Sequence, residues 1–102
     1  MRRVRDYIDA HLSDSIELAE LSEIAGLSIF HFARQFKYSE GMTPHHYLVS
    51  RRVERAKELL AGTNLSLSEV AFAAGFADQS HLTRHFRQIV GITLGQFRRS
   101  LE

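Results

Sequence analysis

One sequence pattern occurs twice in this chain, and the duplication constrains its fold more than any other feature. The pair Ala25-Gly26 recurs as Ala74-Gly75, 49 residues later, and one extra residue after the second pair lengthens the offset to 50. At that offset the identical pairs are His31/His81, Arg34/Arg84, Phe36/Phe86, Gly41/Gly91 and Thr43/Thr93. A repeat of this period is typical of duplicated supersecondary units. Each unit is predicted to be a helix, a tight glycine turn and a second helix with an exposed arginine, an arrangement that places a helix in a DNA groove.

The composition favours a small folded domain. The 102 residues are 44% hydrophobic and include seven Phe, which is enough for a core in one compact domain or two small subdomains. The chain has no Cys, so a disulfide framework and a thiolate zinc finger are excluded. No apolar run approaches about 18 residues, and no apolar signal region follows the basic N-terminus, so we expect a soluble, cytoplasmic protein without a membrane partner.

Charge is distributed unevenly along the chain, although the net charge is only +1. Residues 6–33 contain six acidic residues and no Lys or Arg, whereas residues 34–57 contain six basic and two acidic residues. Residues 84–99 carry four basic residues and no acidic one. This asymmetry predicts one positive and one acidic face, as in nucleic-acid-binding proteins. The alternative is an ordinary solvated helix surface, with pairs such as Glu54 with Lys57 and Arg55 with Glu58.

The apolar spacing predicts an all-α fold of about seven helices, and no strand pattern is found. The first helix is expected to end near Ser13-Asp14, and the second to carry Glu17 in its first turn. Later helix ends are predicted at glycines, of which Gly26 can take the left-handed backbone that a sharp turn needs: Gly26, Gly41, Gly62, Gly75 and Gly91. Helix starts are predicted at residues whose side chains cap an N-terminus: Ser28, Thr43, Ser66 or Ser68, Asp78 and Thr93.

The helices that follow the two glycine turns are predicted to be amphipathic, with outward faces suited to DNA. Their expected core residues are Ile29, Phe32 and Phe36 in the first and Leu82, Phe86 and Ile89 in the second. Arg34 and Arg84 offer a planar fork that matches O6 and N7 of guanine, and Phe30 is able to contact a thymine methyl group. Side chains able to read base edges follow in the second helix: Gln79, Ser80 and Thr83. The predicted phosphate contacts are Ser28, Lys37 and Arg87.

Two other functions are compatible with parts of the sequence. A helical protein-interaction domain with degenerate DNA-binding helices would share the fold without binding DNA. His81 and His85 are four residues apart, a spacing that can clamp zinc in a metal-dependent hydrolase. The general-base Glu of a zinc protease is missing between them, no third ligand is evident, and no catalytic constellation is found. We therefore expect a DNA-binding protein that is not an enzyme and has no metal site or cofactor.

The chain resembles the DNA-binding domain of the AraC/XylS family of bacterial transcription regulators over roughly residues 4–99. The most specific part is AGFADQSHLTRHFR, from Ala74 to Arg87, followed by Gly91-Ile92-Thr93 and Phe97-Arg98. The first unit and the segment RVERAKELL from Arg52 to Leu60 fit as well. The resemblance implies one AraC-type domain over residues 1–102. Its parts would be a first helix-turn-helix subdomain at about 4–41, a long linker helix at about 43–61 and a second subdomain at about 65–101.

The resemblance also implies which positions read bases. They carry over to Phe30, Ala33, Arg34, Gln79, Ser80, His81, Thr83 and Arg84. Two departures from the family pattern matter. Ala33 has no hydrogen-bond donor in its side chain, so the first recognition helix is expected to specify fewer bases. Leu94 stands where the family commonly has Pro, which is expected to weaken the start of the last helix.

By the same resemblance, we expect a sequence-specific activator that reads two adjacent major-groove segments of double-stranded DNA and contacts RNA polymerase. Family members usually join this domain to a ligand-sensing or dimerising partner, and nothing in this chain is suited to binding a small effector. The chain starts at Met1-Arg2-Arg3 with a helix already under way. We therefore expect the C-terminal part of a longer effector-responsive regulator, whose effector-binding or dimerisation domain lies outside this chain.

Overall fold

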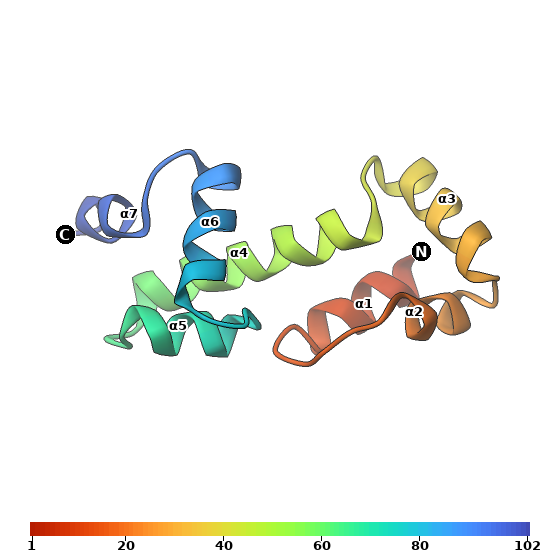
Figure 1. The fold of residues 1–102 in the computed structure, drawn as a ribbon, viewed down its shortest axis with the longest axis horizontal. Helices are drawn as coiled ribbons and strands as arrows, with labels where there is room; N and C mark the ends of the chain where they lie inside the picture. Colours follow the sequence, from red (N-terminus) through yellow and green to blue (C-terminus); the bar gives the residue numbers. More distant parts are fainter. The chain divides into compact units, whose positions relative to one another are not determined.

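The computed structural model describes residues 1–102 and confirms the predicted all-α fold (Figure 1). Its seven helices are α1 (Arg2–Ala10), α2 (Leu18–Ala25), α3 (Ile29–Glu40), α4 (Pro44–Gly62), α5 (Leu67–Ala74), α6 (Gln79–Val90) and α7 (Leu94–Ser100). The chain divides into two compact units, Met1–Val49 and Ser50–Glu102, and α4 runs from the first into the second. No helix is both long and apolar enough to cross a membrane.

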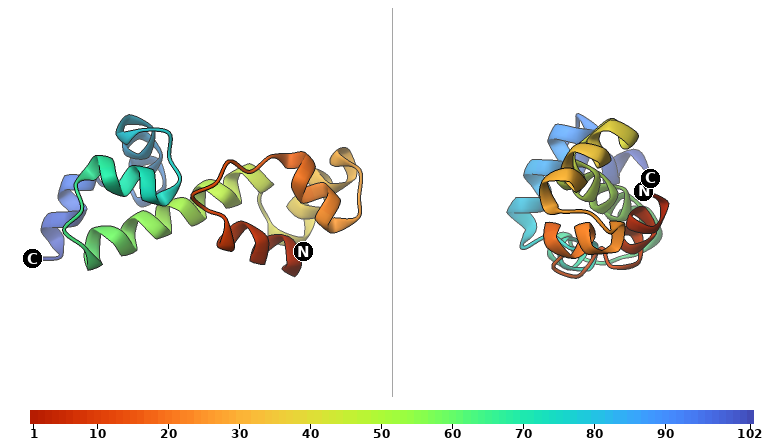
Figure 2. Two further views of the ribbon diagram at one scale, coloured as in Figure 1. Left: turned by 90° about the horizontal axis from the view of Figure 1, so that it is seen from below. Right: turned by 90° about the vertical axis from the view of Figure 1, so that its right-hand side faces the viewer.

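The first unit is built around the two phenylalanines of α3. Phe32 and Phe36 are fully buried against a cluster drawn from the other helices of the unit: Val4, Ile8, Leu21 and Leu48. Figure 2 shows α2 beside α3 in this unit, and the two helices are in contact. The Phe36 ring also meets the Tyr47 ring edge to face, with centroids 5.6 Å apart. Burying each phenylalanine stabilises the unit by about 1.5–3 kcal/mol through the hydrophobic effect.

The second unit repeats this design around α6. Leu82 and Phe86 are fully buried, and Phe86 meets Phe97 of α7 edge to face at 5.5 Å. The rest of the buried set comes from residues 50–62 of α4, from α5 with the turn that follows it, and from α7: Val53, Ala56, Leu59, Leu60, Val70, Ala71, Ala74, Phe76 and Leu94. In each unit, two fully buried side chains four residues apart therefore hold the helix that follows the glycine turn: Phe32 and Phe36 in α3, and Leu82 and Phe86 in α6.

The predicted turns and caps set the direction in which α3 and α6 leave their preceding helices. Gly26 and Gly75 have φ of +70° and +96°, a backbone region that favours glycine because it has no Cβ. At the start of α3 the Ser28 hydroxyl accepts the His31 N–H at 3.2 Å. At the start of α6 an Asp78 carboxylate oxygen accepts the His81 N–H at 2.8 Å. Both recognition-type helices thus begin at a defined residue.

Four details of the sequence-based prediction are wrong. The first helix ends at Ala10 rather than near Ser13-Asp14, because the backbone of His11 leaves the helical region, while Leu12 in the following turn still packs on the core. Glu17 caps α2 from outside instead of lying in its first turn. Ile29 and Ile89 are largely exposed rather than buried. Both lie at helix ends, where apolar spacing no longer guarantees a packing neighbour.

The last helix begins where the sequence predicts. It starts at Leu94, and Thr93 and Gln96 form a complete capping box: the Gln96 N–H donates to the Thr93 hydroxyl and the Thr93 N–H donates to the Gln96 side chain. Leu94 is buried. The capping box therefore supplies a start signal of its own at a position that lacks proline.

Candidate nucleic-acid interface

The outward face of α3 combines an aromatic ring with a cation. The Phe30 side chain is 69% exposed, and the guanidinium carbon of Arg34 lies over its ring at 5.5 Å from the centroid. Such a cation–π contact holds the arginine against the helix surface and limits the conformations it must give up on binding. Ala33, which was predicted on the same face, is only half-exposed. Lys37 is exposed one turn after Ala33.

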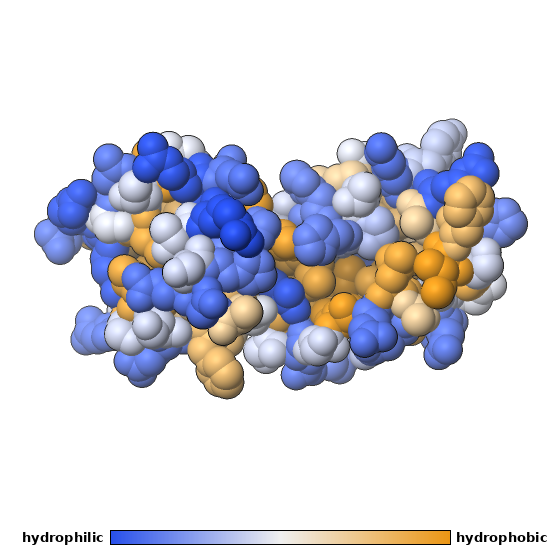
Figure 3. Space-filling model, in the orientation of Figure 1, coloured by the Kyte–Doolittle hydropathy of each residue, from blue (hydrophilic) through white to orange (hydrophobic).

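Tyr38 extends this face and was missed from the sequence. Its side chain is 89% exposed, the highest value among the large apolar and aromatic residues of the chain. Together with His31, Arg34 and Gln35 it lines a surface depression of about 370 Å³. The available signal was its spacing, since Tyr38 follows Arg34 by four residues and Phe30 by eight, which is one helix face. In Figure 3 apolar surface gathers around α2 and the beginning of α3, where Leu27, Ile29 and Phe30 are exposed.

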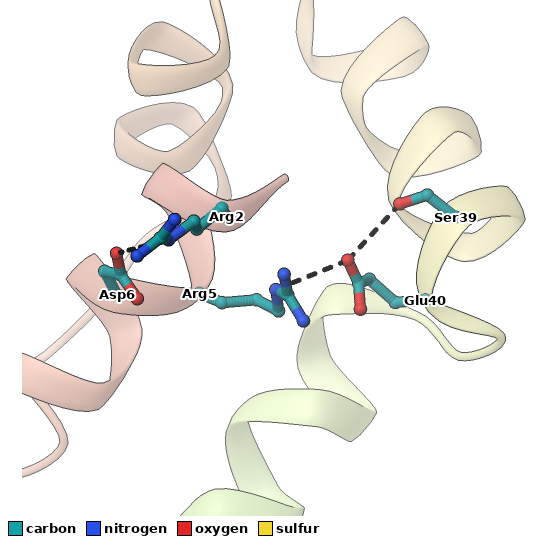
Figure 4. A network of polar contacts seen from close by, with 5 residues as sticks. All are labelled: Arg2, Arg5, Asp6, Ser39 and Glu40. Atoms are coloured by element: carbon teal, nitrogen blue, oxygen red, sulfur yellow. Dashed lines mark hydrogen bonds and ion pairs between the residues drawn. The ribbon is translucent and has the colours of Figure 1, made fainter.

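The far end of α3 is tied to α1 by an ion pair. Figure 4 shows the Arg5 guanidinium and the Ser39 hydroxyl both facing the Glu40 carboxylate. Nε of Arg5 lies 3.5 Å from one Glu40 carboxylate oxygen, and the Ser39 hydroxyl donates to the same oxygen at 3.4 Å. The Glu40 side chain is only 16% exposed. Glu40 is the single acidic residue of α3, so this pairing leaves the outward face of the helix without an unpaired negative charge. A second pair on α1, Arg2 with Asp6, is fully solvated.

The outward face of α6 is polar and cationic. All of its predicted contact residues except His81 are exposed: Gln79, Ser80, Thr83, Arg84 and Arg87. The helix contains no acidic residue. Gln79 is oriented by the preceding helix, because its side-chain oxygen accepts a hydrogen bond from the Ser68 hydroxyl of α5 at 3.1 Å. Arg84 forms no ion pair, so its guanidinium is available to an anionic or hydrogen-bonding partner.

His81 and Ser28 have local partners that change how they could contact DNA. The His81 ring is half-buried and packs edge on against Phe76 and His85, at centroid distances of 5.4 and 4.7 Å. No three His, Asp or Glu side chains come together in a way that could hold a metal ion. The Ser28 hydroxyl accepts the His31 N–H, so it keeps only its own proton to donate to a phosphate.

The basic segment of α4 is partly neutralised, as the solvated-surface interpretation expects. An Arg55 guanidinium nitrogen lies 3.0 Å from the Glu58 carboxylate, and Nζ of Lys57 lies 3.3 Å from that of Glu54. Exposed pairs of this kind contribute little to stability, with a median of about 0–1 kcal/mol. On α3 and α6, by contrast, the cations of the outward faces are exposed: Arg34, Lys37, Arg84 and Arg87.

Comparison with known proteins identifies the family. The model of a helix-turn-helix domain family matches residues 21–100, which include both glycine turns and both outward helices. An AraC-type DNA-binding-domain protein of Chromobacterium violaceum has the same fold, with a TM-score of 0.91 over 98% of this chain and 89% of that one at 24% identity. The chain belongs to the AraC-type helix-turn-helix family.

Curated relatives of this chain are named as transcription regulators. A probable transcriptional regulator of Photobacterium leiognathi, LumQ, is 39% identical over 88% of this chain and 36% of its own length. The transcriptional activator Btr of Bacillus subtilis is 32% identical over 82% of this chain and 16% of its own. The DNA-binding domain of AdpA, solved in complex with a target DNA, superposes with a TM-score of 0.91 at 29% identity, over 97% of this chain and 89% of that one. The chain thus spans about a third or less of the curated relatives' length.

Proposed function

We propose that this AraC-type domain binds double-stranded DNA in a sequence-specific way and regulates transcription, with α3 and α6 each reading a major-groove segment. The observation that carries the proposal is the repeated geometry of these helices. Each begins after a left-handed glycine turn and presents an exposed arginine two residues before a fully buried phenylalanine. A helix fixed by its inner face in this way can enter a groove with its outer face without rearranging.

Base reading is assigned to the side chains on the first turns of the two helices. In α6, Gln79, Ser80, Thr83 and Arg84 offer donors and acceptors that match base edges in the major groove. In α3, Arg34 offers the corresponding fork, while Phe30 and Ala33 offer apolar contact with thymine methyl groups. His81 belongs to the same set.

Backbone contacts are assigned to residues that lie further along each helix or at its start. Lys37 and Arg87 present cations one turn beyond the base-reading arginines, a position that suits phosphate oxygens. Ser28 has its hydroxyl proton free to donate at the start of α3. To these we add Tyr38, because its exposed phenol borders the depression next to Arg34 and would donate to a phosphate.

The regulatory setting follows from the relatives rather than from the site. We propose an activator that contacts RNA polymerase in the bacterial cytoplasm, since the relative Btr is an activator. We also propose that the domain works as the C-terminal, DNA-binding part of a longer effector-responsive regulator, because it matches 36% or less of the curated relatives LumQ and Btr.

Selection of bound duplexes from a randomised pool tests the proposal. Duplexes of about 30 base pairs are long enough to span three helical turns. At near-physiological salt, enrichment of two short sequence boxes is the expected result. Retention without enrichment, which disappears as salt rises, would reduce the activity to non-specific backbone binding. Absence of any retention would favour the alternative of a helical protein-interaction domain with degenerate DNA-binding helices.

A further inference from the structure

The turn before α6 is one residue longer than the turn before α3, and the extra residue has a partner. Leu27 and the cap Ser28 follow Gly26, whereas Phe76, Ala77 and the cap Asp78 follow Gly75. The additional backbone N–H, that of Ala77, donates to Nδ1 of the His81 ring at 3.3 Å. The backbone N–H of His81 in turn donates to the Asp78 carboxylate at 2.8 Å. The longer turn is therefore closed by two hydrogen bonds that both involve His81.

His81 occupies the helix position that other helices of this chain use for capping boxes. Three helices have Glu or Gln as their third residue, and its side chain accepts the backbone N–H of the cap: Glu20 in α2, Glu69 in α5 and Gln96 in α7. His81 is the third residue of α6, and its ring accepts an N–H one residue earlier. His31 is the third residue of α3, but its turn is shorter and its ring accepts no backbone N–H.

The rings that pack around His81 hold its imidazole in the orientation in which Nδ1 accepts the Ala77 N–H. Phe76 lies just before the extra residue, and its ring contacts both His81 and His85, at centroid distances of 5.4 and 6.2 Å. His81 and His85 are themselves in edge contact at 4.7 Å. These rings fix the plane of the His81 imidazole independently of the hydrogen bond. The imidazole is thus held by packing on its sides and by the Ala77 amide at Nδ1.

We infer that His81 is a positioning residue for the start of α6 and that its neutral ring is the Nε2–H tautomer. A ring nitrogen that accepts a hydrogen bond carries no proton, so the single proton of the neutral imidazole lies on Nε2. The inference has a consequence that rests on the proposed DNA binding. The His81 ring can donate a hydrogen bond to DNA through Nε2–H, but it cannot accept one. Its partners are restricted to acceptors, namely guanine O6 and N7, adenine N7, thymine O4 or a phosphate oxygen, and exclude the amino groups of adenine and cytosine.

Nitrogen-15 NMR of the imidazole rings in the DNA-free protein tests the tautomer. In alkaline buffer, where imidazoles are neutral, His81 should show the pattern of an unprotonated Nδ1 and a protonated Nε2. His11 supplies the opposite reference, because its Nδ1 lies 2.8 Å from the Tyr7 carbonyl oxygen and must carry the proton there. His31, without such a bond, should show an averaged mixture. A His81 signal that matches either His11 or His31 would overturn the inference.

Two substitutions test the consequence for DNA binding. In His81→Gln, an amide oxygen can accept from the turn while the NH2 group still donates outward. In His81→Phe, the ring packing and the backbone hydrogen bond to Asp78 are retained, but the ring can neither accept from the Ala77 N–H nor donate outward. Binding of the selected duplex should weaken about 3- to 10-fold for His81→Phe, the range expected for one hydrogen bond, and less than about 2-fold for His81→Gln. Circular dichroism checks that both variants keep their helices.

The outcomes separate the inference from the function on which it rests. Equal losses in the two variants, or no loss for His81→Phe, would overturn the assignment of His81 as a positioning donor. A wild-type protein that selects no DNA sequence but shows the Nε2–H tautomer would overturn the proposed function and the DNA consequence, and would leave the turn assignment standing.

Discussion

The two units of this chain bury nearly the same side chains and expose different ones. Phe36 meets Tyr47 edge to face at 5.6 Å in the first unit, and Phe86 meets Phe97 in the same way at 5.5 Å in the second. Outside, α3 presents Phe30 stacked under Arg34, whereas α6 presents Gln79, Ser80 and Thr83 around Arg84. Duplication has thus preserved what orients the outward helix and changed what that helix can recognise.

This difference predicts unequal shares in sequence recognition. Amide and hydroxyl groups distinguish base pairs by their donors and acceptors, while an aromatic ring and a methyl group mainly recognise thymine. The α6 face carries several such polar groups, and the α3 face relies on one arginine for polar contacts with bases. We therefore expect the box read by α6 to be the more sharply defined of the two.

The largest expected effects test the shared part of the two units. Phe36→Ala and Phe86→Ala should each lower the free energy of unfolding by about 3–5 kcal/mol, because both rings are fully buried and leave a cavity. Chemical denaturation, followed by NMR signals from each unit, measures both values. A loss below about 1 kcal/mol at either position would show that the two cores are not equivalent. Phe72→Ala is the matched control, since Phe72 is 79% exposed.

The base-reading arginines are expected to give the next largest effect. Arg84→Ala should weaken binding of the selected duplex by about 1–3 kcal/mol and relax the preference at one base pair, as expected for the loss of a bidentate contact. Arg34→Ala should do the same in the other box. Fluorescence anisotropy with single-base variants of the duplex measures both the loss of affinity and the change in base preference. Equal weakening for every duplex would reassign that arginine to the backbone.

Smaller and uniform effects are expected from the residues assigned to phosphates. Lys37→Ala and Arg87→Ala should weaken binding of all duplexes alike and reduce the slope of log K against log salt by about one. Titrations of a selected and a scrambled duplex at several salt concentrations measure this. If either variant alters the preference between the two duplexes, the residue touches a base.

The smallest expected effect is on the stability of the first unit at alkaline pH, and it comes from Tyr7. The Tyr7 hydroxyl donates to Glu20 at 2.8 Å, and this hydrogen bond, followed by desolvation, raises the pKa of Tyr7 above its usual 10.0. The folded state favours the neutral phenol, so this interaction stabilises the folded protein fully below pH 10.0. That stabilisation is lost as the pH rises through the raised pKa of Tyr7. Tyr7→Phe should therefore reduce the fall in stability over that alkaline window.

Alkaline denaturation series of the wild type and the variant measure this difference. Tyr38→Phe is the control, because Tyr38 is exposed on α3 and has no such carboxylate partner. The first unit is involved alone, since residues 50–102 contain no tyrosine. Parallel curves for the wild type and Tyr7→Phe throughout the alkaline range would contradict the role of the Glu20 hydrogen bond.

Local rules were enough to predict most of the fold. Left-handed glycines and polar caps act within a few residues, so Gly26, Gly75, Ser28 and Asp78 could be assigned from the sequence. Burial at helix ends could not be predicted in this way. The periodic pattern that includes Ile29 and Ile89 gives no information on whether a neighbouring side chain covers them. The early end of α1 was missed for a related reason, since Leu12 keeps the apolar spacing outside the helix.

The residues of the candidate site could be predicted from the sequence, but the hydrogen bonds between neighbouring residues could not. The exposed arginines of α3 and α6 follow from their spacing to the buried phenylalanines. The acceptor role of His81 depends on one inserted residue, Ala77, whose N–H needs a partner only in the longer turn. Tyr38 was missed because an aromatic residue in a helix is expected in the core, although its spacing from Arg34 and Phe30 places it on the outward face.

The most direct test of the two-unit account is to repeat the duplex selection in parallel for the wild type, Arg34→Ala and Arg84→Ala. The account predicts that the wild type enriches two boxes, that Arg34→Ala loses preference in one of them, and that Arg84→Ala loses preference in the other. If both variants lost preference in the same box, or neither changed the enriched sequences, the two helices would not read separate segments of DNA.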